Sequence, residues 1–166
     1  MNFARSIILV VFVFLILAGC VSQKSTTLVK SAMAIKPSES ELPHGWRIES
    51  EDLINPVTRF SIGIKKNDEN LTGIVSVYVQ ESTEKAKKVY GQQSDLIVEN
   101  ADCIVSEYKE TVTVLNATVS ISSIDCIKDN VNLVVYILAS SENVFFDSEK
   151  IKEYKIELAK MVLRKF

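Results

Sequence analysis

The feature that most constrains the fold is an alternation of apolar and polar residues, the pattern of strands that bury one face. Six segments show it, or show the continuous apolar form of a fully buried strand: residues 46–49, 57–66, 71–80, 103–115, 118–127 and 131–139. Residues 67–70 form a turn cluster between the second and third segments, which predicts a β-hairpin there. Residues 131–139 are apolar on both faces, so we expect that strand at the centre of the sheet.

Two further segments have helical spacing. Residues 83–98 follow Ser82, a candidate N-cap, and a second helix begins after Asp147 with a buried stripe that includes Ile151 and Leu158. Strands that run in groups with helices between them indicate an α+β fold. We therefore predict a mainly antiparallel sheet of about five or six strands with two helices packed on it.

The beginning of the chain has the features of an export signal. Arg5 precedes an unbroken apolar run of 12 residues, 7–18. That run is shorter than the roughly 20 residues of a membrane-spanning helix and suits the apolar region of a signal peptide. An uncleaved membrane anchor is the alternative. Both interpretations place residues 21–166 outside the cytoplasm.

The run ends in Leu17-Ala18-Gly19-Cys20, which resembles the lipobox of prokaryotic lipoproteins, those of archaea included. The resemblance implies that a lipid is attached to the sulfur of Cys20 and that the chain is cleaved before it. Membrane lipid, contacted through Cys20, would then be a partner, and the protein would sit on the extracytoplasmic face of the cell membrane.

Three regions follow from this division. Residues 1–19 are expected to be a lipoprotein signal peptide. Residues 20–42, which are rich in serine, threonine and lysine, are expected to be a lipidated flexible tether. Residues 43–166 are expected to be a single α+β domain, because proline and glycine mark its entry just before Trp46.

Two short pieces of this domain resemble the PsbP/Mog1-like superfamily. They are residues 42–46 (LPHGW) at the first strand and residues 157–166 (ELAKMVLRKF) at the last helix. The resemblance implies a PsbP/Mog1-like fold over residues 43–166. It also implies an accessory or binding role, because members of that superfamily are mostly not enzymes.

The remaining cysteines, Cys103 and Cys126, lie in two strands predicted to pair. A hairpin that turns at residues 115–116 pairs positions whose numbers sum to 231, so the two cysteines would be diagonal neighbours, about 7–8 Å apart. A small change of register would bring them within the range of a disulfide, which an oxidising compartment permits. We predict a disulfide between them, and two buried free thiols are the alternative.

Asn70 and Asn116 each begin an Asn-x-Thr sequence at a predicted turn. Such sequences are glycosylation acceptors in exported proteins, although they also occur by chance. Glycosylation at Asn70 and Asn116 is therefore a hypothesis that depends on the host.

No catalytic motif or metal-ligand spacing is present in the sequence. The single histidine, His44, has no obvious orienting partner, and the acids Glu49, Glu51 and Asp52 match no known calcium loop. We therefore predict no catalytic residue, no metal and no cofactor. Five aromatic residues form either core or the lining of a pocket: Tyr78, Tyr90, Tyr136, Phe145 and Phe146.

The formal net charge of −2, without long basic runs, argues against nucleic acid as a partner. The expected function is a membrane-anchored extracytoplasmic lipoprotein with a non-catalytic binding or accessory domain. Its partner, a protein or a small ligand, is not identified by the sequence. The alternatives are a structural envelope protein and an enzyme whose site is made of scattered carboxylates.

Overall fold

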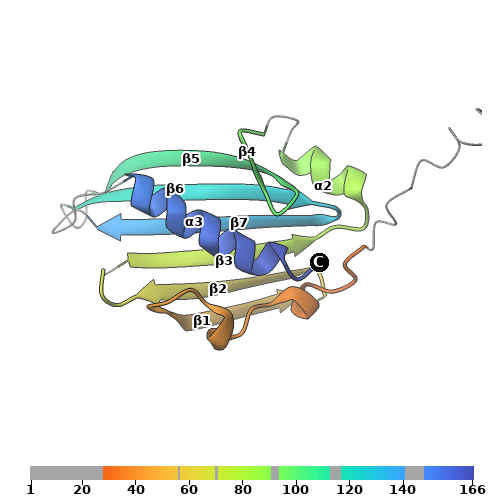
Figure 1. Ribbon diagram of the computed structural model, residues 1–166, viewed down its shortest axis with the longest axis horizontal. Helices are drawn as coiled ribbons and strands as arrows, with labels where there is room; N and C mark the ends of the chain where they lie inside the picture. The colour runs from red at the N-terminus through yellow and green to blue at the C-terminus, as the bar shows by residue number, and fades with distance from the viewer. Residues whose placement is uncertain (1–27, 56, 70, 91–93, 113–116, 141–147) are drawn as a thin grey trace, which may run out of the picture.

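A seven-stranded antiparallel sheet forms the centre of the computed structural model, which describes residues 28–55, 57–69, 71–90, 94–112, 117–140 and 148–166 (Figure 1). The strands are β1 (Trp46–Asn55), β2 (Arg59–Lys66), β3 (Leu71–Val79), β4 (Leu96–Val98), β5 (Ala101–Val112), β6 (Ala117–Lys128) and β7 (Val131–Ser140). Their spatial order is β1-β2-β3-β7-β6-β5-β4. The helices are α2 (Thr83–Tyr90) and α3 (Ser148–Leu163), with the short 3-10 helices η1 (Ala32–Ile35) and η2 (Glu39–Glu41).

The α+β class, the antiparallel sheet and the central position of β7 are confirmed. The predicted strand number is wrong, because the sheet has seven strands rather than five or six. The additional strand is β4, where the sequence was expected to continue a helix to residue 98. Gly91 directly follows α2 and disfavours a helix, whereas the apolar β4 pairs with β5 across a tight turn. Glu99 and Asn100 have positive φ there, as two-residue hairpin turns require.

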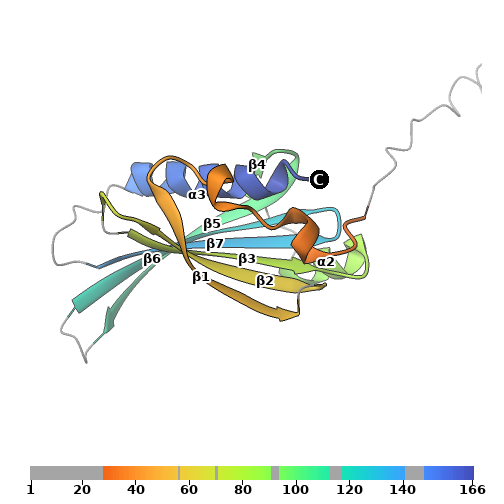
Figure 2. The same ribbon diagram turned by 90° about the horizontal axis from the view of Figure 1, so that it is seen from below.

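The hydrophobic core lies between one face of the sheet and α3 (Figure 2). Alternate residues of β2, β3 and β7 point to this face, and Phe60, Ile62 and Val75 are among those that are fully buried. Helix α3 contributes the predicted stripe, with Ile151 and Leu158 buried. The core face is thus set by the alternation seen in the sequence.

Residues 28–42 pack on the domain, so the expected flexible tether up to residue 42 is wrong for this part. Ala32 and Ile35 of η1 are buried in the core, and the Ala32 N–H donates to the Val57 carbonyl at 2.8 Å. Apolar residues spaced three apart explain this docking, because they share one side of a helical turn. The folded unit therefore includes residues from Leu28 onward, and only residues 20–27 of the expected tether lie outside the described part.

Asn130, in the turn between β6 and β7, holds the beginning of this segment. Its side-chain oxygen accepts the Val29 N–H at 2.9 Å, and its amide nitrogen donates at 2.8 Å to the carbonyls of both Val29 and Gln80. The residue is only 2% exposed. One side chain therefore joins the N-terminal segment to the ends of three strands.

The other face of the sheet is covered by α2 at one end. The Asn132 side chain, which points to that face, donates to the Ala86 carbonyl of α2 at 3.0 Å. Farther along the same face, Ile74 and Tyr136 are paired neighbours and both are exposed. At the sheet edges, β1 has two register breaks and β4 has only three residues.

Lys155 of α3 is fully buried, which the sequence did not predict. Its ammonium group donates to the Ser122 hydroxyl and, at 3.1 Å, to the Ser123 carbonyl. Burial lowers the pKa of Lys155, while the nearby carboxylates of Glu107 and Asp125 act in the opposite direction and Lys152 adds to the lowering. A buried ammonium with neutral partners opposes folding at neutral pH.

The pH dependence of unfolding should reveal this lysine. Consider pH values between the lowered pKa of Lys155 in the folded state and its ordinary pKa in the unfolded state. In this range the unfolded chain binds one more proton than the folded chain, so the free energy of unfolding rises with pH. As the pH rises from neutral to about 10, the free energy of unfolding of the wild type should increase relative to that of a Lys155→Met variant. The increase should be about 1.4 kcal/mol for each unit by which folding lowers the pKa of Lys155. Chemical denaturation at several pH values measures this. A Lys160→Met control, at a less buried position of the same helix, should run parallel to the wild type, and equal pH slopes for all three proteins would contradict the expectation.

Candidate functional site

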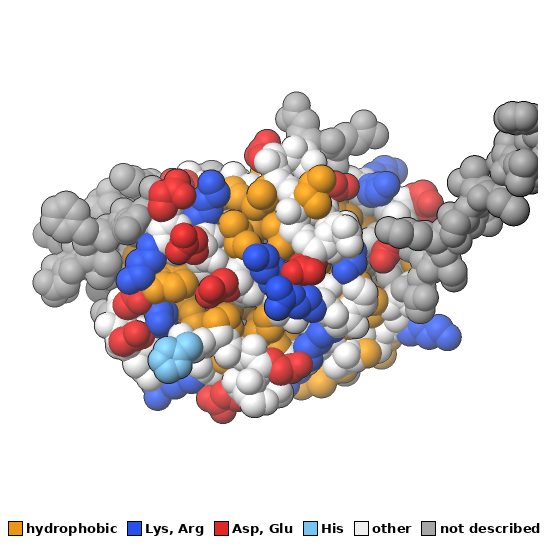
Figure 3. All heavy atoms as spheres, in the orientation of Figure 1, with side chains coloured by type: hydrophobic (Ala, Val, Ile, Leu, Met, Phe, Trp, Pro, Cys, Tyr) orange, Lys and Arg blue, Asp and Glu red, His pale blue; other side chains and the backbone are white. Residues whose placement is uncertain are grey.

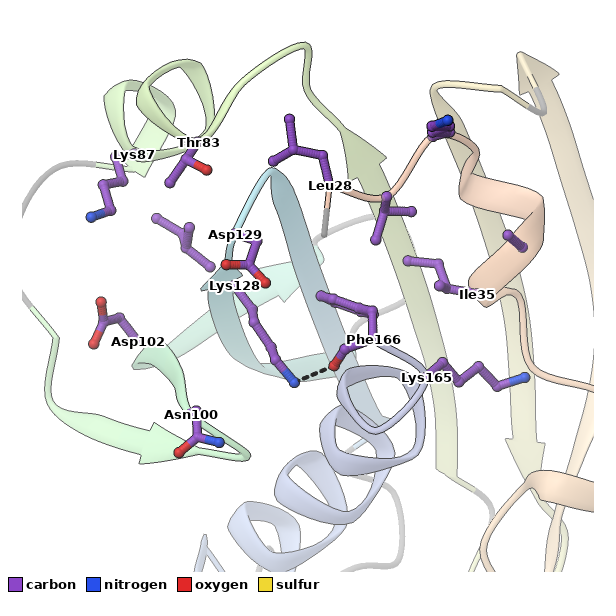
Figure 4. A pocket seen from close by; sticks show the side chains of 14 residues that line it. Leu28, Ile35, Thr83, Lys87, Asn100, Asp102, Lys128, Asp129, Lys165 and Phe166 are labelled. Atoms are coloured by element: carbon purple, nitrogen blue, oxygen red, sulfur yellow. Dashed lines mark hydrogen bonds between the residues drawn. The ribbon is translucent and has the colours of Figure 1, made fainter. Parts of the chain in front are cut away.

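A groove of about 700 Å³ opens at the end of the sheet where β1, β3 and β6 terminate, which we call the groove end (Figure 4). This volume lies within the range of small-molecule sites. The lining combines apolar and charged side chains: Leu28, Val29, Lys30, Ala34, Ile35, Thr83, Lys87, Asn100, Asp102, Ile127, Lys128, Asp129, Lys165 and Phe166.

Five separate segments meet around the groove. Helix α2 begins shortly after β3 ends and contributes Thr83 and Lys87. The β4–β5 turn supplies Asn100, the β6–β7 turn supplies Asp129, and the residues after α3 supply Phe166 (Figure 4). The docked residues 28–35 form the remaining wall, so the groove exists because that segment is packed in place.

Lys128 stabilises the apolar part of the groove around Phe166. The Lys128 ammonium donates to the backbone oxygens of Leu163, at 2.8 Å, and of Phe166. It also lies 5.0 Å from the centre of the Phe166 ring, a cation–π distance. These contacts fix Phe166 against the end of β6.

The charges of the groove are unevenly neutralised. Lys165 bonds to the Lys36 carbonyl at 3.0 Å and to the Glu41 carboxylate at 2.8 Å. With the Ser38 hydrogen bonds, this contact lowers the pKa of Glu41 to about 2. Lys30, Lys87 and Lys128 form no salt bridge with a carboxylate of the described residues, and neither do two lining acids, Asp102 and Asp129. Three cations therefore face two carboxylates.

The cysteine pair lies inside the core and is not part of the groove lining. Cys103 of β5 and Cys126 of β6 are directly opposed, with Cα atoms 4.1 Å apart, and the structure joins them by a disulfide. The predicted register is wrong, because the paired positions differ from the expected ones by two residues. Val112 at the end of β5 pairs with Ala117 at the start of β6, so the paired numbers sum to 229 rather than 231.

The polar residues singled out in the sequence do not converge. His44 lies at the opposite end of the sheet, where its carbonyl accepts a hydrogen bond from Lys66. Glu49 pairs with Arg47 and Lys65, whereas Glu51 pairs with Lys36. In the described ranges, no group of three or more histidine, cysteine, aspartate or glutamate residues is arranged to hold a metal ion.

The aromatic residues considered for a pocket are dispersed too. Tyr78 stacks under the Arg59 guanidinium at 4.9 Å, and Tyr136 is on the open sheet face. Neither lines the groove. Phe145, Phe146 and the side chain of Tyr90 lie outside the described residues, as do three predicted modification sites: Cys20, Asn70 and Asn116.

The groove residues were missed because nothing in their local pattern distinguishes them. Lys30, Lys87 and Lys128 look like ordinary solvated lysines in the sequence. The available signal was the spacing of Val29, Ala32 and Ile35, which is typical of a segment that packs on something. Recognising it would have placed residues 28–35 on the domain, although not at a particular end of the sheet.

Comparisons with known proteins add one structural likeness. No protein-family model and no curated protein matches the chain significantly. A crystal structure of a protein from Bacteroides thetaiotaomicron VPI-5482 superposes with a TM-score of 0.42 at 10% sequence identity. The superposition covers 66% of this chain and 40% of that one.

Proposed function

We propose that this protein is a lipid-anchored extracytoplasmic binding protein. Residues 1–19 are removed as a signal peptide, Cys20 carries the lipid, and the domain from Leu28 onward presents the groove to a small ligand. The resemblance of residues 42–46 and 157–166 to PsbP/Mog1-like domains supports a binding role rather than catalysis. The described residues include no helix long and apolar enough to span a bilayer.

Two observations support export and anchoring. The apolar run of 12 residues followed by Leu17-Ala18-Gly19-Cys20 has the order of a lipoprotein signal. The direct opposition of Cys103 and Cys126 suits an oxidising compartment, in which disulfides persist.

The groove is the observation that carries the binding role. Its side chains Ile127 and Phe166 suit an apolar chain, and the excess of cations over carboxylates favours an anionic group. Its lining offers no histidine, cysteine or serine, and Thr83 is the one hydroxyl among the residues named. We therefore propose a small amphipathic anion as the class of ligand.

The anchor is tested on the protein isolated from cells. Intact mass should show a chain that begins at Cys20 and carries lipid, and the protein should partition into detergent. A Cys20→Ala variant should retain its signal peptide and lack the lipid, whereas Ser22→Ala should behave like the wild type. An unmodified wild-type chain beginning at Met1 would overturn this part of the proposal.

The groove is tested with two amphiphiles that share an alkyl chain and differ in charge. Decanoate should raise the melting temperature in a concentration-dependent manner, and decyltrimethylammonium should not. Lys87→Glu should abolish the decanoate effect, because it reverses one charge at the groove. Lys65→Glu, at the opposite end of the sheet, is the matched control. Equal effects of both amphiphiles would exclude a specific anion site.

A further inference from the structure

Most exposed apolar side chains of the domain belong to segments at the groove end. Eight large hydrophobic residues are exposed among those described, and six of them are in such segments: Leu28, Met33, Leu53, Val57, Val89 and Ile97. They do not form one continuous patch, because the β1–β2 turn and β4 lie at opposite edges of the sheet. They are instead spread across the width of one end, where a flat apolar surface could contact them together. The other two, Ile74 and Tyr136, are on the open sheet face.

Backbone contacts fix the position of these residues. Val57 lies in the β1–β2 turn, and its carbonyl accepts the N–H of Ala32 in η1. Ile97 pairs with the groove residue Asp102, and Val89 is in α2 with Lys87. Figure 3 shows hydrophobic side chains at the surface along the lower right edge, where η1 and the β1–β2 turn lie in Figure 1.

The same end is where the chain leads toward Cys20. Eight residue steps separate Cys20 from Leu28, and a fully extended chain spans at most about 3.5 Å per residue, so the anchor lies within about 28 Å of the domain. This distance alone allows several orientations. The apolar residues at the groove end select one of them.

We propose that the groove end docks on the surface of the membrane that carries the anchor, with Val57, Val89 and Ile97 inserted at the level of the lipid headgroups. Their exposed fractions are the three largest of the exposed hydrophobic residues: 55%, 61% and 71%. The groove then opens toward lipid, which suits an amphipathic ligand drawn from the bilayer. This inference rests on the proposed lipid anchor.

The charges at the groove end predict the lipid preference. Within the groove, Lys30, Lys87 and Lys128 exceed Asp102 and Asp129 by a single positive charge. One charge suits one anionic group inside the groove, but it attracts an anionic lipid surface only weakly. Docking is driven by apolar contact and should be similar on vesicles of phosphatidylcholine with or without phosphatidylglycerol.

Photolabelling of the lipidated protein in phosphatidylcholine vesicles tests the docking. A carbene precursor dissolved in the bilayer should label peptides that contain Val57, Val89 and Ile97, and should leave those with Ile74 and Tyr136 unlabelled. A Val57→Ser/Val89→Ser/Ile97→Ser variant should lose the label at these sites. Label on Ile74 or Tyr136, or no label on the domain, would overturn the proposal. Intact mass of the same sample reports separately whether Cys20 carries lipid.

A second measurement does not depend on lipidation. Residues 21–166, which contain every described residue, should bind phosphatidylcholine vesicles weakly, and the triple serine variant should bind about tenfold less tightly. An Ile74→Ser/Tyr136→Ser variant should bind like the wild type, and circular dichroism should show that both variants are folded. If the triple variant binds vesicles as tightly as the wild type, the membrane is not the partner. The same conclusion follows if the wild type forms a dimer that does not bind vesicles and the three substitutions dissociate that dimer.

Discussion

Replacing Asn130 with alanine is expected to lower the free energy of unfolding by about 3 kcal/mol and to release residues 28–35 from the domain. Alanine leaves the Val29 N–H and the carbonyls of Val29 and Gln80 without their partner. Unpaired groups of this kind cost about 1–3 kcal/mol each when they stay buried. Chemical denaturation measures the loss, and hydrogen exchange at the Val29 and Ala32 amides reports the release.

Two matched variants test whether the hydrogen bonds of Asn130 cause this loss of stability. Asn130→Asp keeps the acceptor for Val29 but loses the donor, so it should be as damaging as alanine. Asn67→Ala, at an exposed position in the β2–β3 turn, should change stability by less than about 0.5 kcal/mol. If the Val29 amide stays protected in Asn130→Ala, the side chain does not hold the segment.

Removing the Cys103–Cys126 disulfide is expected to destabilise the domain by roughly 3 kcal/mol in the chain-entropy model. The bridge joins residues 23 positions apart, and both sulfur-bearing side chains are buried. A Cys103→Ala/Cys126→Ala variant should therefore unfold at lower denaturant concentration. Reduction of the native protein should be slow, because reductant must reach buried sulfur atoms.

Thiol counting distinguishes the disulfide from the alternative of two free thiols. Protein isolated from cells, unfolded and alkylated without reductant, should take up no alkyl group at Cys103 or Cys126. Prior reduction should allow both to react. Alkylation of both cysteines before reduction would show that they are free thiols in the cell, and would remove one support for export.

The strands could be predicted because burial of one sheet face makes apolar and polar residues alternate along the sequence. Val131 to Ala139 are apolar on both faces, and the strand they form is in fact flanked on both sides by other strands. The register of β5 and β6 could not be fixed in the same way. The alternation repeats every two residues, so a shift by two changes no face and leaves the pattern intact.

The groove could not be predicted because it depends on contacts between distant parts of the chain. Asn130 and Val29 are separated by 101 positions, and their hydrogen bonds decide whether residues 28–35 form a wall or a tether. The burial of Lys155 could not be predicted for a similar reason. Its partners, Ser122 and Ser123, are themselves buried on β6, and no local pattern connects a helix lysine to them.

The broken outer strands of the sheet bear on how neighbouring molecules behave when they crowd together. A long straight edge would expose a row of free N–H and carbonyl groups to which another copy could add. The register breaks after Ile48 and Asp52 in β1, and the three residues of β4, interrupt that row on both sides. Proteins packed side by side at high density can thus remain separate molecules rather than grow into fibrils.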